Sequence, residues 1–291
     1  MCGIYLSENM VAVGLDLGTS YVKCVFDDGQ ITFPSLYAYA KRPIWEKDET
    51  LRFGVGDEAL KVAAYANSVV IRPIVEGRPI HTKGVEELVR EVKRKIDEKS
   101  SVKENRISTI VVGLPDQAEE YRQTLYDIIM NTLSPEKCIV VQQGIGTMEY
   151  IGRRGATVMD IGQGTTEIVA IENMQVTYAQ SVMHGCDFIT SDLGEFAFLD
   201  LKVYEKYRDE IKSRVEMLSD ILSNRLEVFM STLKPMYEYS RTVILSGGGM
   251  LVPDLKDELK KRIKVNVEVS DNPVMSNANG LYKIATRDGI I

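Results

Sequence analysis

The chain has 291 residues, of which 44% are hydrophobic and 26% are charged, and its formal net charge is −7. This composition is typical of a soluble globular protein, and the length favours two domains with sizeable cores. The acidic balance argues against a broad electrostatic grip on nucleic acid or anionic lipid. We therefore expect no direct nucleic-acid binding.

No apolar run approaches the length of a membrane span, and the N-terminus lacks a signal segment. We therefore expect no transmembrane segment, and a cytoplasmic protein that can associate with the inner face of the membrane. The four cysteines, Cys2, Cys24, Cys138 and Cys186, have no metal-site spacing, which indicates reduced and mostly buried thiols. With only two histidines, a His-rich metal centre is excluded.

The elements predicted in the first half of the chain are a strand, turn and strand over 11–26, a loop-rich stretch over 33–51, a short helix opening at Asp57, an extended segment over 69–74, a helix over 82–99, a strand over 107–113, a helix over 116–133 and a strand over 138–141. The later elements are a helix over 143–151, a strand hairpin over 156–171, one long helix or two in series over 204–236, a strand over 242–245, a helix over 255–263, a strand over 265–269 and a helix over 277–286. Strands that alternate with helices indicate an α/β architecture.

Three of the predicted helices carry specific expectations. The helix over 82–99 has a charged outer face opposite an apolar stripe formed by Val85, Leu88, Val89, Val92 and Ile96. The segment over 204–236 has a core-facing stripe formed by Ile211, Val215, Leu218, Leu222, Leu226, Phe229 and Leu233. The helix over 116–133 follows Pro115, with Glu119 placed as a capping-box partner.

Two segments about half the chain apart are near-duplicates: residues 13–20 read VGLDLGTS and residues 158–166 read VMDIGQGTT. Each is an apolar strand, an Asp, a turn rich in Gly, Thr or Ser, and a second strand. The glycines allow the backbone to approach a phosphate, and the amides and hydroxyls donate hydrogen bonds to it. Two such hairpins indicate a duplicated fold with a phosphate clamp between its halves.

These residues resemble the actin family, in particular prokaryotic MreB-type and archaeal actin homologues. Residues 16–20 with Lys23 match the first phosphate loop, residues 160–167 match the second, and residues 245–249 (LSGGG) match the adenosine-binding loop. Residues 33–35 match the segment that follows the first phosphate loop, and residues 55–59 and 71–77 match the small N-terminal subdomain. The resemblance runs in the family's order from Val11 to Ala285.

The resemblance implies the two-domain actin/Hsp70/sugar-kinase fold, an α/β fold of duplicated RNase H-like domains with the nucleotide in the cleft between them. Domain I would comprise residues 1–149, with the C-terminal helix 275–291 returning to it, and domain II would comprise residues 150–274. Only about sixty residues, which look all-helical, separate Gly185 from the loop at Gly247. The fourth subdomain is therefore expected to be reduced.

The resemblance also implies ATP and Mg²⁺ as cofactors and assigns roles at the site. Asp16 and Asp160 would hold Mg²⁺ through water molecules, and Gln143 and Glu167 would position the attacking water, which makes these four the predicted catalytic set. The implied nucleotide-binding residues are Gly18, Thr19, Ser20, Lys23, Gly162, Gln163, Gly164, Thr165, Gly247, Gly248, Gly249 and Lys212, the last as a loosely aligned contact to ribose or adenine.

The implied function is an ATPase that assembles with ATP into cytoskeletal filaments, with copies of itself and with cytoskeletal or membrane-associated adaptor proteins as partners. One alternative is a non-polymerising actin-fold ATPase or adaptor that recruits division, shape or pilus-type partners. A small-molecule kinase of the same superfamily needs a catalytic Asp on the substrate side of the cleft, and the sequence offers no clear candidate. The start at Cys2 resembles a glutamine amidotransferase, but the next residues enter the actin-type hairpin instead.

Overall fold

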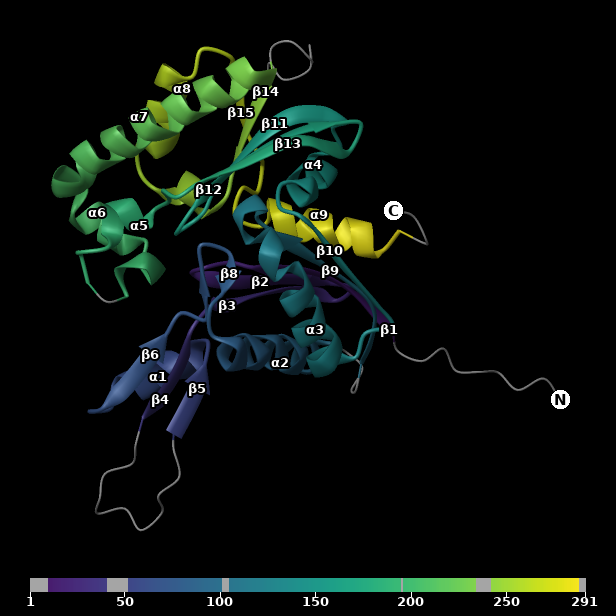
Figure 1. Ribbon diagram of the computed structural model, residues 1–291. Coiled ribbons are helices and arrows are strands. Elements are labelled where there is room, and N and C mark those ends of the chain that lie inside the picture. The colour runs from purple at the N-terminus through teal and green to yellow at the C-terminus, as the bar shows by residue number, and fades with distance from the viewer. Residues whose placement is uncertain (1–9, 41–51, 101–104, 195, 234–241, 288–291) are drawn as a thin grey trace.

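A computed structural model describes the chain over residues 10–40, 52–100, 105–194, 196–233 and 242–287. The chain forms two α/β halves, each around a five-stranded sheet (Figure 1). The first sheet contains, in order, β10 (Lys137–Gln142), β9 (Arg106–Leu114), β1 (Met10–Leu17), β2 (Tyr21–Phe26) and β3 (Gly29–Pro34). The second contains β13 (Gln175–Val182), β12 (Thr166–Glu172), β11 (Gly155–Ile161), β14 (Thr242–Ser246) and β15 (Asn266–Val269).

The two sheets share one topology. In the first, β1 pairs antiparallel with β2 and parallel with β9; in the second, β11 pairs antiparallel with β12 and parallel with β14. Each hairpin continues into a third antiparallel strand, β3 or β13. The predicted duplication is therefore confirmed, because the near-duplicate segments form corresponding hairpins. The predicted domain limits at 149/150 and 274/275 stay predictions.

The predicted helical stripes form the cores beside the sheets. In α2 (Thr82–Lys99) and α7 (Arg208–Leu233), every apolar position named above is buried. They pack in two separate clusters, α2 with α3 (Arg122–Leu133) on the first sheet and α7 with α8 (Leu255–Arg262) on the second. The segment over 204–236 is two helices in series, because α6 (Lys202–Lys206) precedes α7.

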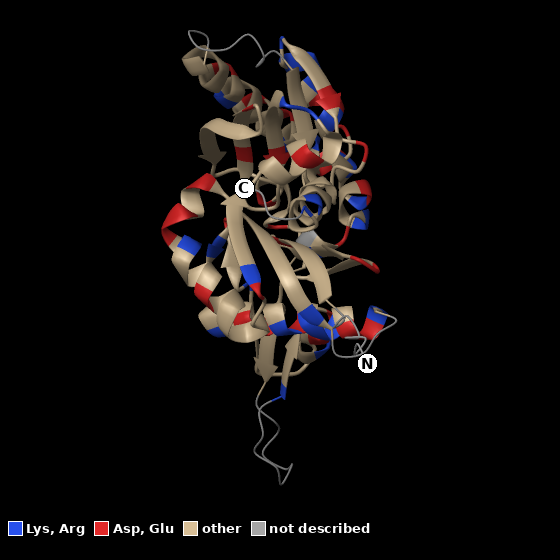
Figure 2. Ribbon diagram, turned by 90° about the vertical axis from the view of Figure 1, so that its right-hand side faces the viewer, with Lys and Arg blue, Asp and Glu red and all other residues tan. Residues whose placement is uncertain are grey.

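The outer surfaces of the helices carry both signs of charge. Along α2, Arg90 pairs with Glu87 and Arg94 pairs with Glu91, all within three residues along the helix. In the view of Figure 2, basic and acidic residues are interspersed rather than gathered on separate faces. The prediction that α2 is a solvated surface helix is confirmed.

Two short helices join the halves. Helix α4 (Ile145–Ile151) packs mainly on the second sheet, and α9 (Ser276–Ala285) packs on the first (Figure 1). The two helices also contact each other at glycines: a Cβ atom on Gly280 would lie 1.6 Å from the carbonyl oxygen of Gly146. Because no side chain separates the backbones at this point, the contact is among the closest between the halves.

A small lobe extends from the first half. It contains the sheet β5-β4-β6, formed by β5 (Arg52–Val55), β4 (Tyr37–Ala40) and β6 (Ser68–Ile71), with helix α1 (Asp57–Ala63) and the hairpin of β7 (Ile74–Val75) and β8 (Arg78–Pro79). The prediction that residues 33–51 are loop-rich is wrong for β4, while residues 41–51 lie outside the described residues. The alternation Tyr-Ala-Tyr-Ala over 37–40 is a period-two strand pattern, in which Ala38 and Ala40 pack in a cluster with α1.

Two further expectations need correction. The segment after Pro115 begins as a 3-10 helix over Asp116–Tyr121 without a side-chain cap, and Glu119 forms an ion pair with Arg122 instead of a capping box. Proline has no side-chain acceptor, so the reciprocal box cannot form at that position. Strand β13 was not predicted at all.

The fourth lobe is short, as predicted. Between β13 and α7, the described residues form the helical segments α5 (Asp187–Thr190), a 3-10 turn over Ala197–Leu199, and α6. This lobe lies on the second half and reaches back to the small lobe, because Phe196 and Leu199 pack against the cluster that contains Leu36 and Ala59. The two lobes therefore meet over the cleft.

Candidate functional site

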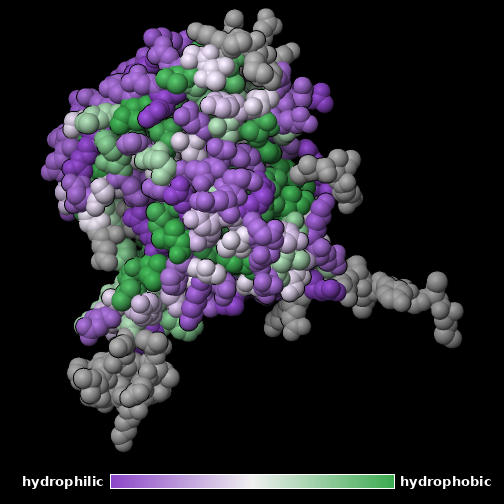
Figure 3. Space-filling view, viewed as in Figure 1, coloured by the Kyte–Doolittle hydropathy of each residue, from purple (hydrophilic) through white to green (hydrophobic). Residues whose placement is uncertain are grey.

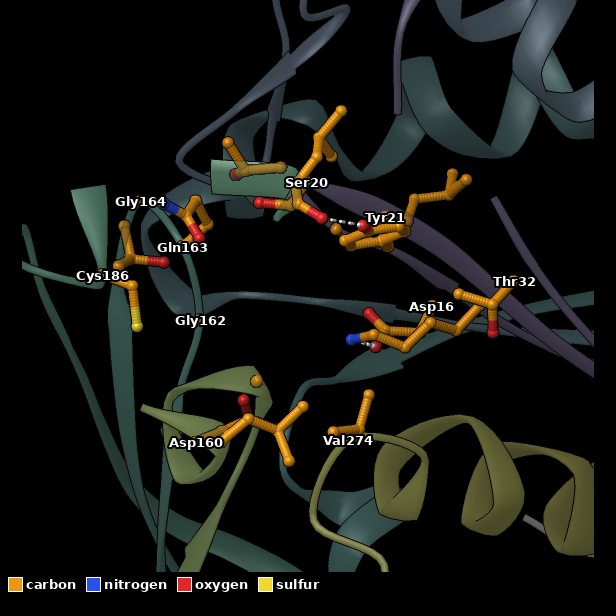
Figure 4. A pocket seen from close by; sticks show the side chains of 18 of the residues that line it. Asp16, Ser20, Tyr21, Thr32, Asp160, Gly162, Gln163, Gly164, Cys186 and Val274 are labelled. Atoms are coloured by element: carbon orange, nitrogen blue, oxygen red, sulfur yellow. Dashed lines mark hydrogen bonds and ion pairs between the residues drawn. The ribbon is translucent and has the colours of Figure 1, made fainter. Parts of the chain in front are cut away.

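A cavity of about 460 Å³ lies between the two halves, within the range typical of small-molecule sites. Its wall combines both duplicated hairpins with the fourth lobe (Figure 4). The predicted site residues that line it are Asp16, Gly18, Thr19, Ser20, Lys23, Gln143, Asp160, Gly162, Gln163, Gly164, Thr165, Glu167 and Gly248. Residues far apart in the sequence thus meet at one cavity.

The first hairpin turn is closed by a hydrogen bond from the amide of Gly18 to the carbonyl of Tyr21, at 3.1 Å. A Cβ atom on Gly18 would lie 2.8 Å from that carbonyl, so the turn requires glycine. The buried hydroxyl of Ser35 donates to the carbonyl of Gly18 at 2.6 Å and supports the turn from behind. Within the described residues, Ser20 Oγ is buried without a partner, which suits a hydroxyl that donates to a ligand.

The second hairpin turn repeats this geometry. The amide of Gly162 donates to the carbonyl of Thr165 at 2.8 Å. The start of α5 is bound to this turn, because the amide of Asp187 donates to the carbonyl of Gln163 at 2.7 Å and the Gln163 side chain donates back to the Asp187 carboxylate at 2.8 Å. A Cβ atom on Gly185 would lie 2.5 Å from the same carbonyl, so this glycine also permits a close approach.

A compact charge cluster lies between the turns. Asp16 on β1 and Asp160 on β11 are 5% and 6% exposed, and Lys23 Nζ lies 2.9 Å from Asp16 Oδ2. Asp16 and Lys23 face each other because they are register partners on β1 and β2. Burial lowers the pKa of Lys23, but the Asp16 and Asp160 carboxylates outweigh it, so the net pKa lies above its ordinary value.

Asp160 is a buried carboxylate whose protonation is strongly affected by its surroundings. Burial raises its pKa to about 6, against the opposing effect of Lys23, and the Gln143 side chain hydrogen-bonds to it. A bound cation stabilises the charged form of such a buried carboxylate, because its positive charge compensates for the solvation by water that burial removes. The chemistry of the cluster thus fits a hydrated divalent cation.

Glu167 connects the two halves. Its Oε1 accepts from the Asp116 amide at 2.9 Å and from Gln142 Nε2 at 3.0 Å, both in the first half, and its Oε2 accepts from Ser181. Burial raises its pKa to about 7, against these hydrogen bonds. The contact of Gln142 with Glu167 was not predicted, because no motif separates Gln142 from the adjacent Gln143.

The glycine-rich third loop lies against the second hairpin. Gly247 has a φ of +89°, and a Cβ atom there would lie 2.4 Å from the Ile161 carbonyl and 2.6 Å from Asp160 Oδ1. Gly249 contacts Ile161 in the same way, and only Gly248 of the three lines the cavity. Gly247 and Gly249 therefore allow the backbone of the third loop to lie directly against β11, the strand that carries Asp160.

Lys212, like Gly247 and Gly249, is a predicted site residue that does not line the cavity. It is exposed on α7 and is not among the lining residues, whereas Lys202 and Leu251 are. The short α6 precedes α7 and supplies the cationic side chain at this wall.

The roof over the cavity joins the first half, including its small lobe, to the fourth lobe. The hydroxyl of Tyr21 donates to the carbonyl of Leu199 at 2.8 Å, and Arg72 forms an ion pair with Asp187 at 2.8 Å. Tyr21 and Leu199 both line the cavity. The contact of Tyr21 with Leu199 was not predicted, because neither of these two residues belongs to a phosphate-loop motif.

The donors present fit Mg²⁺ held mainly through water. Within the described part of the chain, no group of three or more His, Cys, Asp or Glu residues is placed to hold a metal ion directly. Mg²⁺ usually retains several waters and takes one or two carboxylates plus phosphate oxygens. Two buried carboxylates beside two phosphate-loop turns are such a set.

The described cysteines are free thiols, as predicted. Burial raises the pKa of Cys24 and Cys186 to about 12 and that of Cys138 to about 11. These thiols therefore stay protonated near neutral pH and are poor nucleophiles. Cys2 lies outside the described residues.

A family model for MreB/Mbl protein matches residues 10–197, more than half of the 291-residue chain. The chain belongs to the MreB/Mbl family. It is thus a member of the prokaryotic actin-like ATPase family, and the predicted two-domain actin-like fold is confirmed by solved structures. MreB5 of Spiroplasma citri bound to AMPPNP matches with a TM-score of 0.74 and 16% identity, over 95% of this chain and 96% of that one.

Two further proteins are similar to this chain. The MamK double helical filament matches with a TM-score of 0.73 and 17% identity, over 97% of this chain and 100% of that one. The cell division protein FtsA of Streptococcus pneumoniae is 25% identical over 168 residues, which is 50% of this chain and 35% of the length of FtsA. No helix among the described residues of this chain is both long and apolar enough to cross a membrane.

Proposed function

We propose that this protein is an ATPase that binds Mg-ATP in the cavity and assembles with its own copies into nucleotide-dependent filaments. The observation that carries the proposal is the pair of equivalent turns, closed at Gly18 and Gly162, which face one cavity from two halves. Two such turns bind a phosphate chain from both sides. Because they belong to different halves, phosphate binding depends on the angle between the halves. The structural match to MreB5, which was solved with bound AMPPNP, supports nucleotide binding.

Each part of the site has a proposed role. Residues Thr19, Ser20, Gly164 and Thr165 donate to phosphate oxygens, and Lys23 adds a positive charge. Asp16 and Asp160 hold the waters of Mg²⁺, which supplies neutralisation of phosphate charge when bound. Gln143 and Glu167 position the attacking water, and both line the cavity.

Self-assembly is supported by exposed apolar surface on both halves. Phe53 is 61% exposed and Val69 is 42% exposed, and both are register partners of Tyr39 in the small lobe. Figure 3 shows a hydrophobic patch over β6 of this lobe. On α7, Met217 and Val228 are 54% and 58% exposed. Head-to-tail contacts between different surfaces that do not close into a ring produce a filament.

The test is sedimentation and negative-stain microscopy of the full chain with Mg-ATP, with Mg-ADP and without nucleotide, together with ATP turnover. We expect filaments with Mg-ATP and their loss in Asp16→Asn. Asp127→Asn is the matched control, because Asp127 is exposed on α3 outside the cavity and accepts only a local hydrogen bond from Gln123. Polymer that forms equally without nucleotide would contradict the proposal.

The second candidate is a non-polymerising actin-fold ATPase or adaptor that recruits partner proteins. The match to the cell division protein FtsA and the short fourth lobe favour it. In that case the protein binds nucleotide and remains monomeric across salt, temperature and concentration. The same sedimentation experiment separates the two candidates.

A further inference from the structure

Three hydroxyls are enclosed together beside Asp160, a residue that lines the cavity. Thr147 on α4, Ser246 at the end of β14 and Ser276 on α9 are all 0% exposed. The Oγ atoms of Ser246 and Ser276 lie 2.7 Å apart, and Thr147 Oγ1 lies 3.3 Å and 3.2 Å from them. Buried hydroxyls in mutual contact form a connected network rather than separate local caps.

This network reaches one of the proposed magnesium carboxylates. Ser246 Oγ lies 3.4 Å from Asp160 Oδ2, and the two residues are register partners on the parallel strands β14 and β11. The carbonyl of Pro273 is the other fixed acceptor, at 3.2 Å from both Ser246 and Ser276. The Thr147 and Ser276 hydroxyls therefore reach Asp160 through Ser246.

The number of protons limits how the network is arranged. Each hydroxyl donates one hydrogen bond, and the fixed acceptors are Asp160 Oδ2 and the Pro273 carbonyl. If Ser246 donates to Asp160, the Pro273 carbonyl is left for Ser276, and Thr147 can donate to one of the two serines. If Ser246 donates to Ser276 instead, the carboxylate loses this donor. The direction of the Ser246 hydroxyl is thus linked to the state of Asp160.

The same network crosses the contact between the two halves. Thr147 belongs to α4 and Ser276 to α9, and these helices meet backbone to backbone at Gly146 and Gly280. A close contact of this kind transmits small displacements, because no flexible side chain lies between the helices. A change at Ser246 therefore affects both helices at the point where the halves join.

We propose that Ser246 is a positioning residue that orients the Asp160 carboxylate toward bound Mg²⁺, and that Thr147 and Ser276 couple this orientation to the packing of α4 on α9. The inference rests on the proposed Mg-nucleotide function. Ser246 itself touches Asp160, not the ligand, so it acts on the metal site through that carboxylate. Groups that orient a metal-binding residue typically change metal affinity by about 10- to 100-fold when removed.

The test measures the Mg²⁺ concentration that half-maximally slows release of a fluorescent ADP analogue from the full chain. We expect Ser246→Ala to raise this concentration by about tenfold, with little change in release without Mg²⁺. In an Asp160→Asn background, Ser246→Ala has no further effect, because its route to the metal is already lost. Ser219→Ala is the matched control: Ser219 is also fully buried, but it donates to the Val215 carbonyl within α7.

A second measurement tests the coupling to the helices. Hydrogen exchange of the α4 and α9 amides slows on Mg-ADP binding in the wild type, and this change is reduced in Ser276→Ala but not in Ser219→Ala. An unchanged Mg²⁺ requirement in a folded Ser246→Ala, or an equal loss in the Asp160→Asn background, overturns the positioning role. A wild type that binds no nucleotide overturns the proposed function and this inference with it.

Discussion

Arg72 Nη1 lies 2.8 Å from Asp187 Oδ2 and joins the end of the small lobe to the start of α5 across the roof of the cavity. Asp187 is also bound to Gln163 of the second phosphate-loop turn. The contact therefore links the small lobe to the residues proposed to hold phosphate. Opening of the roof requires that this ion pair separate.

Loss of the Arg72 charge is expected to speed nucleotide release. The two side chains are 27% and 30% exposed, so Arg72→Gln should lower the free energy of unfolding by less than about 1 kcal/mol. Release of a fluorescent ADP analogue should accelerate several-fold in stopped-flow measurements. Arg90→Gln is the control, because Arg90 pairs with Glu87 on the outer face of α2. Equal release rates in the two variants would show that the pair does not restrain the roof.

The second roof contact gives a separate prediction. Tyr21→Phe removes the hydroxyl that donates to the Leu199 carbonyl and should cost about 1 kcal/mol of unfolding free energy, since the carbonyl loses its partner. Nucleotide release should accelerate as well. Tyr178→Phe is a suitable comparison, since that ring packs on Phe229 in the second half. Chemical denaturation of both variants measures the cost, and no difference between them contradicts the assignment.

Glu167 should make stability depend on pH. Its pKa is about 7 in the folded protein against 4.5 as the ordinary value, so the folded state binds the proton more tightly. The tighter proton binding adds about 3 kcal/mol to the free energy of unfolding. This added stability is fully present below the unfolded pKa and is lost as pH rises through about 7. In Glu167→Gln the contribution is absent. Urea unfolding without nucleotide at about pH 5 and about pH 8 should show a larger fall for the wild type than for the variant.

The opposite result has a clear meaning. If the wild type and Glu167→Gln lose the same stability between the two pH values, the Glu167 carboxyl titrates normally. A constant offset between the proteins is expected from the altered hydrogen bonds to Asp116 and Gln142 and does not affect the comparison.

The contact between α4 and α9 should not tolerate a side chain. Gly280→Ala places a methyl group 1.6 Å from the Gly146 carbonyl oxygen and should destabilise the protein by about 3 kcal/mol or more, because backbone must move. Gly248→Ala is the matched control for stability, since nothing lies within 4 Å of the added atom. Thermal unfolding of both variants decides the matter, and a Gly280→Ala protein as stable as Gly248→Ala would contradict the close approach of the two helices.

Local chemistry could be predicted from the sequence to a large extent. The first phosphate-loop turn needs glycine at Gly18 for steric reasons, and the stripe along α2 shows which face is buried. Such features depend on residues a few positions apart, so a pattern reveals them. The alternating residues of β4 carried a similar signal, although the sequence analysis interpreted that stretch as loop.

Contacts between distant segments could be established only from the tertiary structure. Gln142 rather than Gln143 donates to Glu167, Lys202 rather than Lys212 lines the cavity, and the Leu199 carbonyl accepts from Tyr21. Each depends on how the two halves and their lobes pack together. The residues of the roof and of the buried hydroxyl network carry no motif of their own, because any residue that presents the right atom at the right place can make these contacts.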